Sequence, residues 1–398
     1  MHIPDGFVST PINIASAAAS IGVVGYALRR AGSALDQRRI PLLGVVAAFI
    51  FAAQMLNFPV VAGTSGHFVG AALAAILLGP FEAVLVMASV LVLQCLMFAD
   101  GGITALGSNV FNMGIIGALF GYAVFTGLRA ILPRNKSGML AAAAVAAWAS
   151  VVASALSCAV MLGASGTFPI SIAMPAMGVV HALIGIGEAI MTTVAVSLVL
   201  ATRPDLIYAL HGRGIGAVAA PKERVASPAW GFVVAGLGVA LVLGTILSPF
   251  ASASPDGLDR NAINVSADKI AEAAKEEIAK PNVTSVVIEA NKEVAERLED
   301  THSEAHGILA SSAPDLSRIE VKGSDEFEIF EGKITANGEV VRQFTQAKPL
   351  WTRAPIADYD LGIRNSPVLS AAIAGLIGTL LAFGLTFFVV NAIRGRRR

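Results

Sequence analysis

The chain has 398 residues, of which 55% are hydrophobic and 14% charged, and its mean hydropathy is +0.71. These values exclude an ordinary soluble domain and predict an all-α polytopic membrane protein. The zero net charge conceals a segregation, because 21 of the 28 acidic residues lie between residues 251 and 365. We therefore expect a hydrophobic helical bundle and a separate acidic insert.

The chain opens with Met1-His2-Ile3-Pro4-Asp5-Gly6-Phe7. This segment lacks the features of a signal peptide, and we expect none in front of it. We expect residue 1 to supply a free α-amine. The amine, the amide nitrogen of His2 and the Nδ1 atom of His2 can close two chelate rings around one ion. Three nitrogens in a plane suit Ni(II) or Cu(II). The alternative is a Met-His start that arose by chance. The Pro4-Asp5-Gly6 turn signal predicts that the segment folds back into the bundle.

Apolar runs long enough to cross a bilayer, about 20 residues each, predict the membrane spans. They lie near 12–30, 40–62, 80–98, 104–128, 139–163, 177–201, 229–250 and 366–391. A shorter run, 67–79, ends at Gly79-Pro80 and completes nine predicted crossings. All 15 basic residues outside 251–365 fall on one side of this arrangement, which the positive-inside rule identifies as cytoplasmic. The C-terminus is then expected in the cytoplasm, and the N-terminus and the acidic loop outside it.

His67 follows a loop of small residues, 62–66, on the same predicted side as Met1. Glycine in such a loop permits a close backbone approach. His67 could therefore supply a fourth nitrogen to a square-planar site. The alternative is an interfacial histidine that hydrogen-bonds to water.

Four polar residues within the spans are candidates for supporting roles. His181 and Glu188 are seven residues apart and share a helical face. Ionisable groups in a span usually mark a pathway or an internal pair, so a path for the ion or proton and a plain helix–helix hydrogen bond both stay open. Asn109 and Asn112 are three residues apart and could orient His67 or the N-terminal loop. A helix–helix bond is again the alternative.

The acidic loop predicts an extracytoplasmic α+β domain of about 110 residues. Helices are expected at 263–280 and 290–309, and strands at 283–289, 317–321 and 326–330. His302 and His306, four residues apart, could collect cations, although a solvated charged face is the favoured explanation. Asp5 is a further candidate ligand. The segment Asp256-Gly257-Leu258-Asp259 could contact the N-terminal loop instead of collecting cations.

Taken together, four segments resemble the CbiM/NikM family of substrate-specific components of energy-coupling-factor transporters for cobalt and nickel. The segments are Met1–Phe7, His67 in its small-residue loop, 101–113 and 181–188. The resemblance covers about residues 1–205. It implies that Met1, His2 and His67 bind one Ni(II) or Co(II) ion through the terminal amine, the His2 amide and two imidazoles.

Residues 229–391 resemble the auxiliary CbiN/NikN-type component, which has two helices around an extracytoplasmic loop. Ser254–Asp259 is similar to its PDGLE-type motif, with Asp259 in place of the final Glu. The loop is longer than expected of a minimal auxiliary subunit. The resemblance implies a fused chain with a seven-helix metal-binding component at 1–205, a cytoplasmic linker at 206–228 and a two-helix auxiliary module at 229–398 that carries the extracytoplasmic domain 251–365.

The motif G-x-x-x-x-G-K-[ST] does not occur, so we expect no ATPase in this chain. The resemblance implies separate ATPase subunits, a transmembrane coupling subunit and a bacterial or archaeal cell membrane. We expect lipid neighbours, no organic cofactor and no nucleic acid. Ni(II) uptake is the favoured function, and Co(II) uptake for cobalamin synthesis is the alternative.

Two other classes of protein stay open. An intramembrane metalloenzyme could use His67, His181 and Glu188, although the chain has no H-E-x-x-H run. A metal sensor could use the outer domain as its reader.

Overall fold

The computed structural model describes residues 1–34, 39–60, 64–210, 230–252, 254, 256–312, 319–345, 353–363 and 366–395. The chain divides into two compact units. The helical unit comprises Met1–Asp256 and Pro349–Arg398, and the mixed unit comprises Gly257–Lys348. Most of the predicted linker 206–228 lies outside the described residues.

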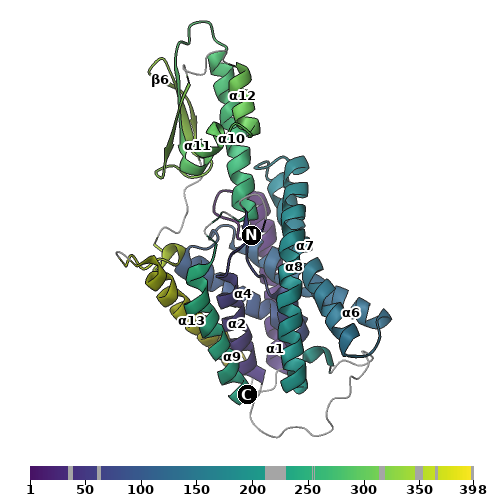
Figure 1. Ribbon diagram of the computed structural model, residues 1–398. Helices are drawn as coiled ribbons and strands as arrows, with labels where there is room; N and C mark the ends of the chain where they lie inside the picture. The colour runs from purple at the N-terminus through teal and green to yellow at the C-terminus, as the bar shows by residue number, and fades with distance from the viewer. Residues whose placement is uncertain are drawn as a thin grey trace. The chain divides into compact units, whose positions relative to one another are not determined.

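The first part of the helical unit alternates long helices with short ones (Figure 1). Its elements are α1 (Thr10–Ala34), α2 (Ile40–Gln54), β1 (Phe58–Pro59), β2 (Ser65–Gly66), α3 (Ala71–Leu78) and α4 (Pro80–Phe98). The predicted span 40–62 is helical only to Gln54, because the chain then turns into a hairpin in which β1 pairs antiparallel with β2. Gly79, at φ 109°, separates α3 from α4, and Pro80 begins α4, where its missing N–H costs nothing.

The rest of the helical unit combines long helices with short helical turns. They are α5 (Leu106–Asn109), the π-helical η2 (Val110–Phe120), α6 (Gly121–Ile131), α7 (Lys136–Ala164), α8 (Ile170–Thr202), the short turns η3 (Pro204–Leu206) and η4 (Tyr208–Leu210), α9 (Trp230–Val242), η5 (Leu243–Leu247), η6 (Ser248–Phe250), η8 (Ala357–Tyr359) and α13 (Pro367–Gly395). Met1 lies at one end of this bundle, and α13 ends near the opposite one (Figure 1).

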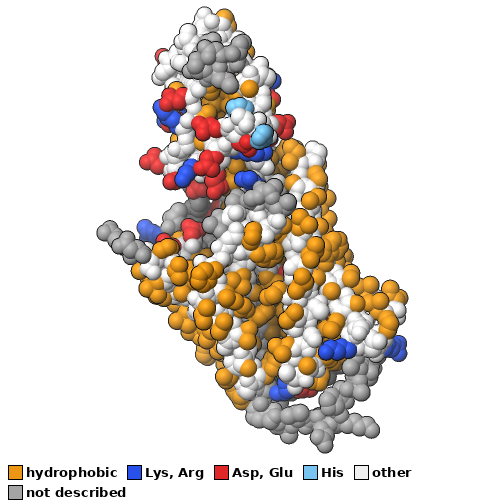
Figure 2. Space-filling view, viewed as in Figure 1, with side chains coloured by type: hydrophobic (Ala, Val, Ile, Leu, Met, Phe, Trp, Pro, Cys, Tyr) orange, Lys and Arg blue, Asp and Glu red, His pale blue; other side chains and the backbone are white. Residues whose placement is uncertain are grey.

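Among the residues that the structure describes, seven helical segments are long and apolar enough to cross a membrane by length and composition. They are Thr10–Ala31, Pro80–Phe98, Leu106–Ile131, Lys136–Ala164, Ile170–Thr202, Trp230–Phe250 and Pro367–Ile393. Hydrophobic side chains cover the visible outer surface of the helical unit (Figure 2). The chain is a multi-pass membrane protein. The buried helices α2 and α3 correspond to the other two predicted crossings, and the count of nine stays a prediction.

The last helices pack tightly on the first part of the chain. Ala48 and Ala52 of α2 form a small core with Ala240 of α9, and α13 packs against α2 as well. A Cβ atom on Gly375 would lie only 1.6 Å from the carbonyl oxygen of Gly244, so α13 and η5 touch backbone to backbone. Helices from both ends of the sequence therefore form one unit.

The mixed unit combines three helices with a four-stranded sheet. Its elements are α10 (Gly257–Ile278), β3 (Val286–Asn291), α11 (Lys292–Glu299), α12 (Glu304–Ser312), β4 (Ile319–Ser324), β5 (Gly332–Ala336) and β6 (Glu339–Phe344). The strand order is β4-β3-β5-β6, with β3 and β4 parallel and the other pairs antiparallel. Alternate residues of β3 are buried against α10 and α11, which is typical of a sheet with one covered face.

Two expectations for this unit were wrong. The predicted strand 326–330 lies mainly in a turn, and the strands that follow, β5 and β6, were not foreseen. The predicted helix 290–309 is broken after Glu299, because Asp300 accepts a hydrogen bond from the His302 amide (3.0 Å) and Ser303 caps α12 through the His306 amide (2.9 Å). His302 and His306 therefore do not share one helical face.

Candidate metal centre

The N-terminal segment is buried at the end of the bundle. Met1, Ile3 and Phe7 are each no more than 3% exposed, and Gly6 turns the chain at φ 85°. The Asp5 carboxylate accepts hydrogen bonds from the Thr104 amide (2.8 Å) and the Thr104 hydroxyl (2.5 Å). The predicted fold-back is confirmed.

Asn109, at the end of α5, ties this segment to the start of the apolar segment Leu106–Ile131. Its Oδ1 accepts from the Ile3 amide (2.8 Å), and its Nδ2 donates to the Ile3 carbonyl (3.1 Å). The Gly102 amide donates to the same carbonyl (2.8 Å). Both the amide and the carbonyl of Ile3, the residue that follows His2, are therefore held by hydrogen bonds.

Three of the predicted ligands converge. The Met1 amine lies 3.2 Å from Nε2 of His67, and the His2 and His67 rings stack with centroids 5.1 Å apart and an interplanar angle of 16°. The Nδ1 atom of His67 lies 3.1 Å from the Phe68 carbonyl, which can only accept, so the ring proton sits on Nδ1 and the Nε2 lone pair faces the amine. Burial, and then the charges of the amine and His2, lower the pKa of His67 to about 3. A neutral imidazole of this kind is a metal ligand.

His2 is held by a carboxylate that the sequence did not single out as a site residue. Its Nδ1 lies 2.9 Å from Oδ1 of Asp100, and its Nε2 is buried with no hydrogen-bond partner among the described residues. The Tyr359 hydroxyl donates to Oδ2 of Asp100 (2.6 Å). Burial alone would raise the pKa of Asp100, but His2 and the hydrogen bonds from His2 and Tyr359 lower it below its ordinary value. Asp100 is therefore an ionised acceptor.

Asp256 forms an ion pair with the Met1 amine. The same segment reaches the His67 loop, because Ser65 donates to the Ser254 carbonyl (2.7 Å) and forms a parallel bridge with Asp256. This agrees with the sequence-based expectation that the Asp256 segment contacts the N-terminal loop.

The other predicted residues take different positions. Asn112 accepts from the Ser157 hydroxyl (2.7 Å) and lies beside the Met161 sulfur, not beside the N-terminal loop. Nδ1 of His181 bonds to a carbonyl one turn back on its own helix, that of Met177 (2.8 Å).

Glu188, also on α8, accepts from the amides of Val69 and Gly70 at 2.8 and 2.7 Å. Glu188 thus anchors the backbone just after His67. The described residues contain no group of three His, Cys, Asp or Glu side chains that could hold a metal, so His67, His181 and Glu188 do not form one, and neither do His302 and His306 with their acidic neighbours.

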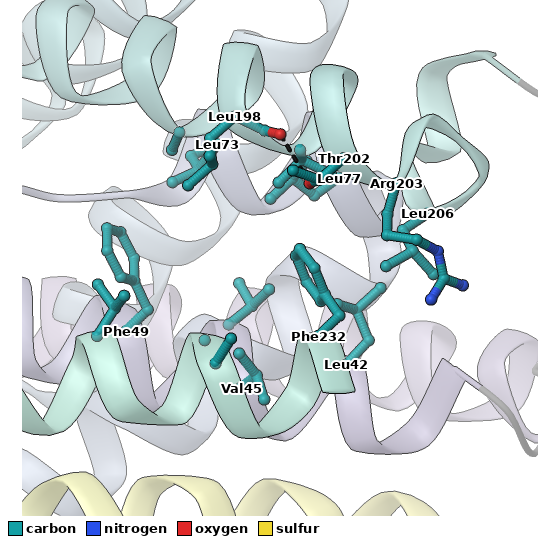
Figure 3. A pocket seen from close by; sticks show the side chains of 16 residues that line it. Leu42, Val45, Phe49, Leu73, Leu77, Leu198, Thr202, Arg203, Leu206 and Phe232 are labelled. Carbon is teal, nitrogen blue, oxygen red and sulfur yellow. Dashed lines mark hydrogen bonds between the residues drawn. The ribbon is translucent and has the colours of Figure 1, made fainter. Parts of the chain in front are cut away.

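A cavity of about 430 Å³ lies elsewhere in the helical unit, among α2, α3, α8 and α9 (Figure 3). Its lining is almost entirely apolar, and its one charged side chain, Arg203, pairs with Asp205. None of the candidate ligands lines it.

The CbiM family model, described as the cobalt uptake substrate-specific transmembrane region, matches residues 2–206, which is more than half of the chain. The chain belongs to the CbiM family. A second family model, the PDGLE domain, matches residues 230–290. This CbiM-family chain therefore joins a CbiM/NikM-type component to a NikN-like module.

Relatives named as nickel transport proteins and relatives named as cobalt transport proteins are both similar to this CbiM-family chain. A chain of Archaeoglobus fulgidus that carries the name of a fused nickel transport protein, NikMN, is 47% identical over 209 residues, which are 52% of this chain and 68% of the relative. The fused nickel transport protein NikMN of Rhodobacter capsulatus is 33% identical over 258 residues (61% and 71%). The cobalt transport protein CbiM of Sorangium cellulosum is 35% identical over 178 residues (43% and 77%).

Proposed function

We propose that this chain is the substrate-binding membrane component of an energy-coupling-factor transporter that imports Ni(II). The observation that carries the proposal is the convergence of the Met1 amine, His2 and His67 in a buried corner of the bundle. In this proposal, partner subunits hydrolyse ATP, and a transmembrane coupling subunit transmits their conformational change to this chain. The cell membrane of a bacterium or archaeon is the proposed location, with Met1 on the outer face.

The four proposed ligands are the terminal amine of Met1, the amide nitrogen of His2, Nδ1 of His2 and Nε2 of His67. Nε2 already faces the amine at 3.2 Å, so one ion between them would replace the proton that they share. The amine and the amide must lose protons as the metal binds. Because an imidazole nitrogen has one lone pair and cannot hold a proton and a metal together, Nδ1 of His2 must also give up its hydrogen bond to Asp100.

The NikN-like module has a proposed part in loading. Asp256, in the PDGLE-type segment, holds the amine in its ammonium form through an ion pair. We infer that this contact keeps the empty site closed and opens when an ion displaces the proton. Glu188 then serves as an anchor for the His67 loop, because its carboxylate holds the two amides that follow Phe68.

Nickel is proposed over cobalt because a planar set of nitrogens suits Ni(II). The names of the relatives include both metals, so Co(II) is the alternative substrate.

An N-terminal extension tests the proposal. Gly-Ser, placed between a new initiator methionine and Met1, converts the amine into an amide and should abolish uptake of radioactive nickel in cells that also express the partner subunits. The matched control adds Gly-Ser after the last residue and should transport normally. Equal amounts of both variants in the membrane, measured by a tag, exclude loss of the protein. Normal nickel uptake by the N-terminal variant would contradict the amine-ligand proposal.

A further inference from the structure

Tyr359 reaches the candidate metal centre from a part of the chain that neither family match includes. It lies in η8, shortly before α13, and its hydroxyl donates to Oδ2 of Asp100 (2.6 Å). The other oxygen of that carboxylate lies 2.9 Å from Nδ1 of His2. Three side chains from distant parts of the sequence thus form one hydrogen-bonded series, Tyr359–Asp100–His2.

The position of Tyr359 is fixed from several sides. Its ring stacks on Phe98, with centroids 4.7 Å apart and planes 18° apart. The Ile356 amide donates to the carbonyl of Met97 at the end of α4 (2.9 Å). Asp358 and Tyr359 both have positive φ angles, 52° and 58°. Residues other than glycine rarely adopt this backbone conformation, and it persists where the surrounding structure enforces it.

The carboxylate of Asp100 has little freedom in this arrangement. A carboxylate accepts and does not donate, so Oδ1 takes the N–H of His2 and Oδ2 takes the O–H of Tyr359. With both oxygens engaged, the group cannot rotate without losing a hydrogen bond. An imidazole that binds a metal through one nitrogen usually donates its other N–H to such a fixed acceptor, which sets the orientation of the ring.

We propose that Tyr359 is a positioning residue of the metal centre, which fixes Asp100 so that Asp100 can orient the imidazole of His2. This inference rests on the proposed function, because it takes His2 as a ligand. In the empty site Asp100 holds Nδ1–H of His2. When the ring turns and Nδ1 binds the ion, the proton of the neutral imidazole lies on Nε2. The same fixed carboxylate can then accept a hydrogen bond from Nε2–H. The turn before α13 thereby influences the affinity of the metal site.

The test is Tyr359→Phe in the purified full chain, with Ni(II) alone as the probe and its affinity measured by calorimetry. The substitution keeps the stacked ring and removes only the hydroxyl, so we expect Ni(II) to bind about tenfold more weakly. Asp100→Asn should weaken binding at least as much. Because Tyr359 acts through Asp100, the double variant should bind no more weakly than Asp100→Asn alone. Tyr122→Phe, on α6, is the matched control and should bind as the unchanged protein does.

Several results would overturn this inference. Unchanged affinity in Tyr359→Phe is one, and additive losses in the double variant are another. Phe98→Leu removes the stacking partner and leaves the hydroxyl in place, so an equal loss of affinity there would assign the effect to packing. The extension before Met1 separates the two proposals: if it leaves Ni(II) affinity unchanged, the proposed ligand set fails. If it abolishes binding while Tyr359→Phe does not weaken it, only the role of Tyr359 fails.

Discussion

Two carboxylates contact the candidate ligands. Asp256 pairs with the Met1 amine, and Asp100 accepts from the ring of His2. Each carboxylate occupies a nitrogen that the proposed ion needs, so metal binding and these contacts exclude one another. In the proposed loading step, the Met1 amine gives up a proton to bind the ion, whereas the proton of His2 shifts from Nδ1 to Nε2, where Asp100 can accept its hydrogen bond. Neither carboxylate is a proposed ligand.

Asn109 offers a test of how far the backbone next to His2 must be fixed. Asn109→Ala removes both hydrogen bonds to Ile3, a loss of about 1–3 kcal/mol from the docking of the N-terminal segment. We expect the Ni(II) affinity, measured by calorimetry, to fall by up to the corresponding factor, about 5- to 150-fold. Asn112→Ala is the matched control, because Asn112 lies one turn further on and bonds to Ser157. Equal losses in both variants would argue against a specific role for Asn109.

At the scale of single residues, the sequence allows the members of the candidate site that carry a chemical signature to be proposed. Met1, His2 and His67 could be named because chelating nitrogens at a chain start and a histidine in a small-residue loop are visible without a structure. The partners Asp100 and Tyr359 could not be found this way. They are 259 residues apart in the sequence, and only the packing of η8 against the end of α4 brings them together.

Among the elements, the loop between α4 and α5 is shaped around the N-terminal segment. A Cβ atom on Gly102 would lie 2.3 Å from the amide nitrogen of Asp5 and 2.4 Å from its Oδ1. Both distances are well inside van der Waals contact, and one of the atoms is backbone. The loop therefore needs glycine at this position so that the segment can approach.

Gly102→Ala should accordingly displace the N-terminal segment. Forcing a methyl group into such a space costs about 1–3 kcal/mol, and we expect Ni(II) binding to weaken about 5- to 150-fold by calorimetry. Gly127→Ala is the control, because a Cβ atom there meets no atom within 4 Å and alanine favours the helix. Unchanged binding in Gly102→Ala would mean that the segment docks differently.

The elements themselves were predictable to the extent that their periodicity or hydropathy was strong. The long apolar helices follow from their composition, whereas α2 ends earlier than its apolar run because β1 and β2 pair instead. In the mixed unit, the break before α12 depends on hydrogen bonds that the side chains of Asp300 and Ser303 accept from the amides of His302 and His306. The apolar pattern over residues 290–309 does not reveal such local side chain–backbone hydrogen bonds.

At the scale of the whole molecule, a metal-binding component and an auxiliary module are joined in one chain, and the helices α9 and α13 pack directly on α2. This packing brings the Asp256 segment and Tyr359 to the N-terminus. The count of nine crossings and the outer location of Met1 stay predictions from the distribution of basic residues. At one end of the helical unit, we propose, the first two residues and His67 hold the ion through nitrogen atoms.

X-ray absorption at the nickel edge, recorded on the purified full chain loaded with one equivalent of Ni(II), tests this claim most directly. We predict four nitrogen donors in a plane, with the scattering signature of two imidazoles, and loss of that signature in the variant extended before Met1. A six-coordinate ion bound mainly by oxygen, or a spectrum that the extension leaves unchanged, would contradict it.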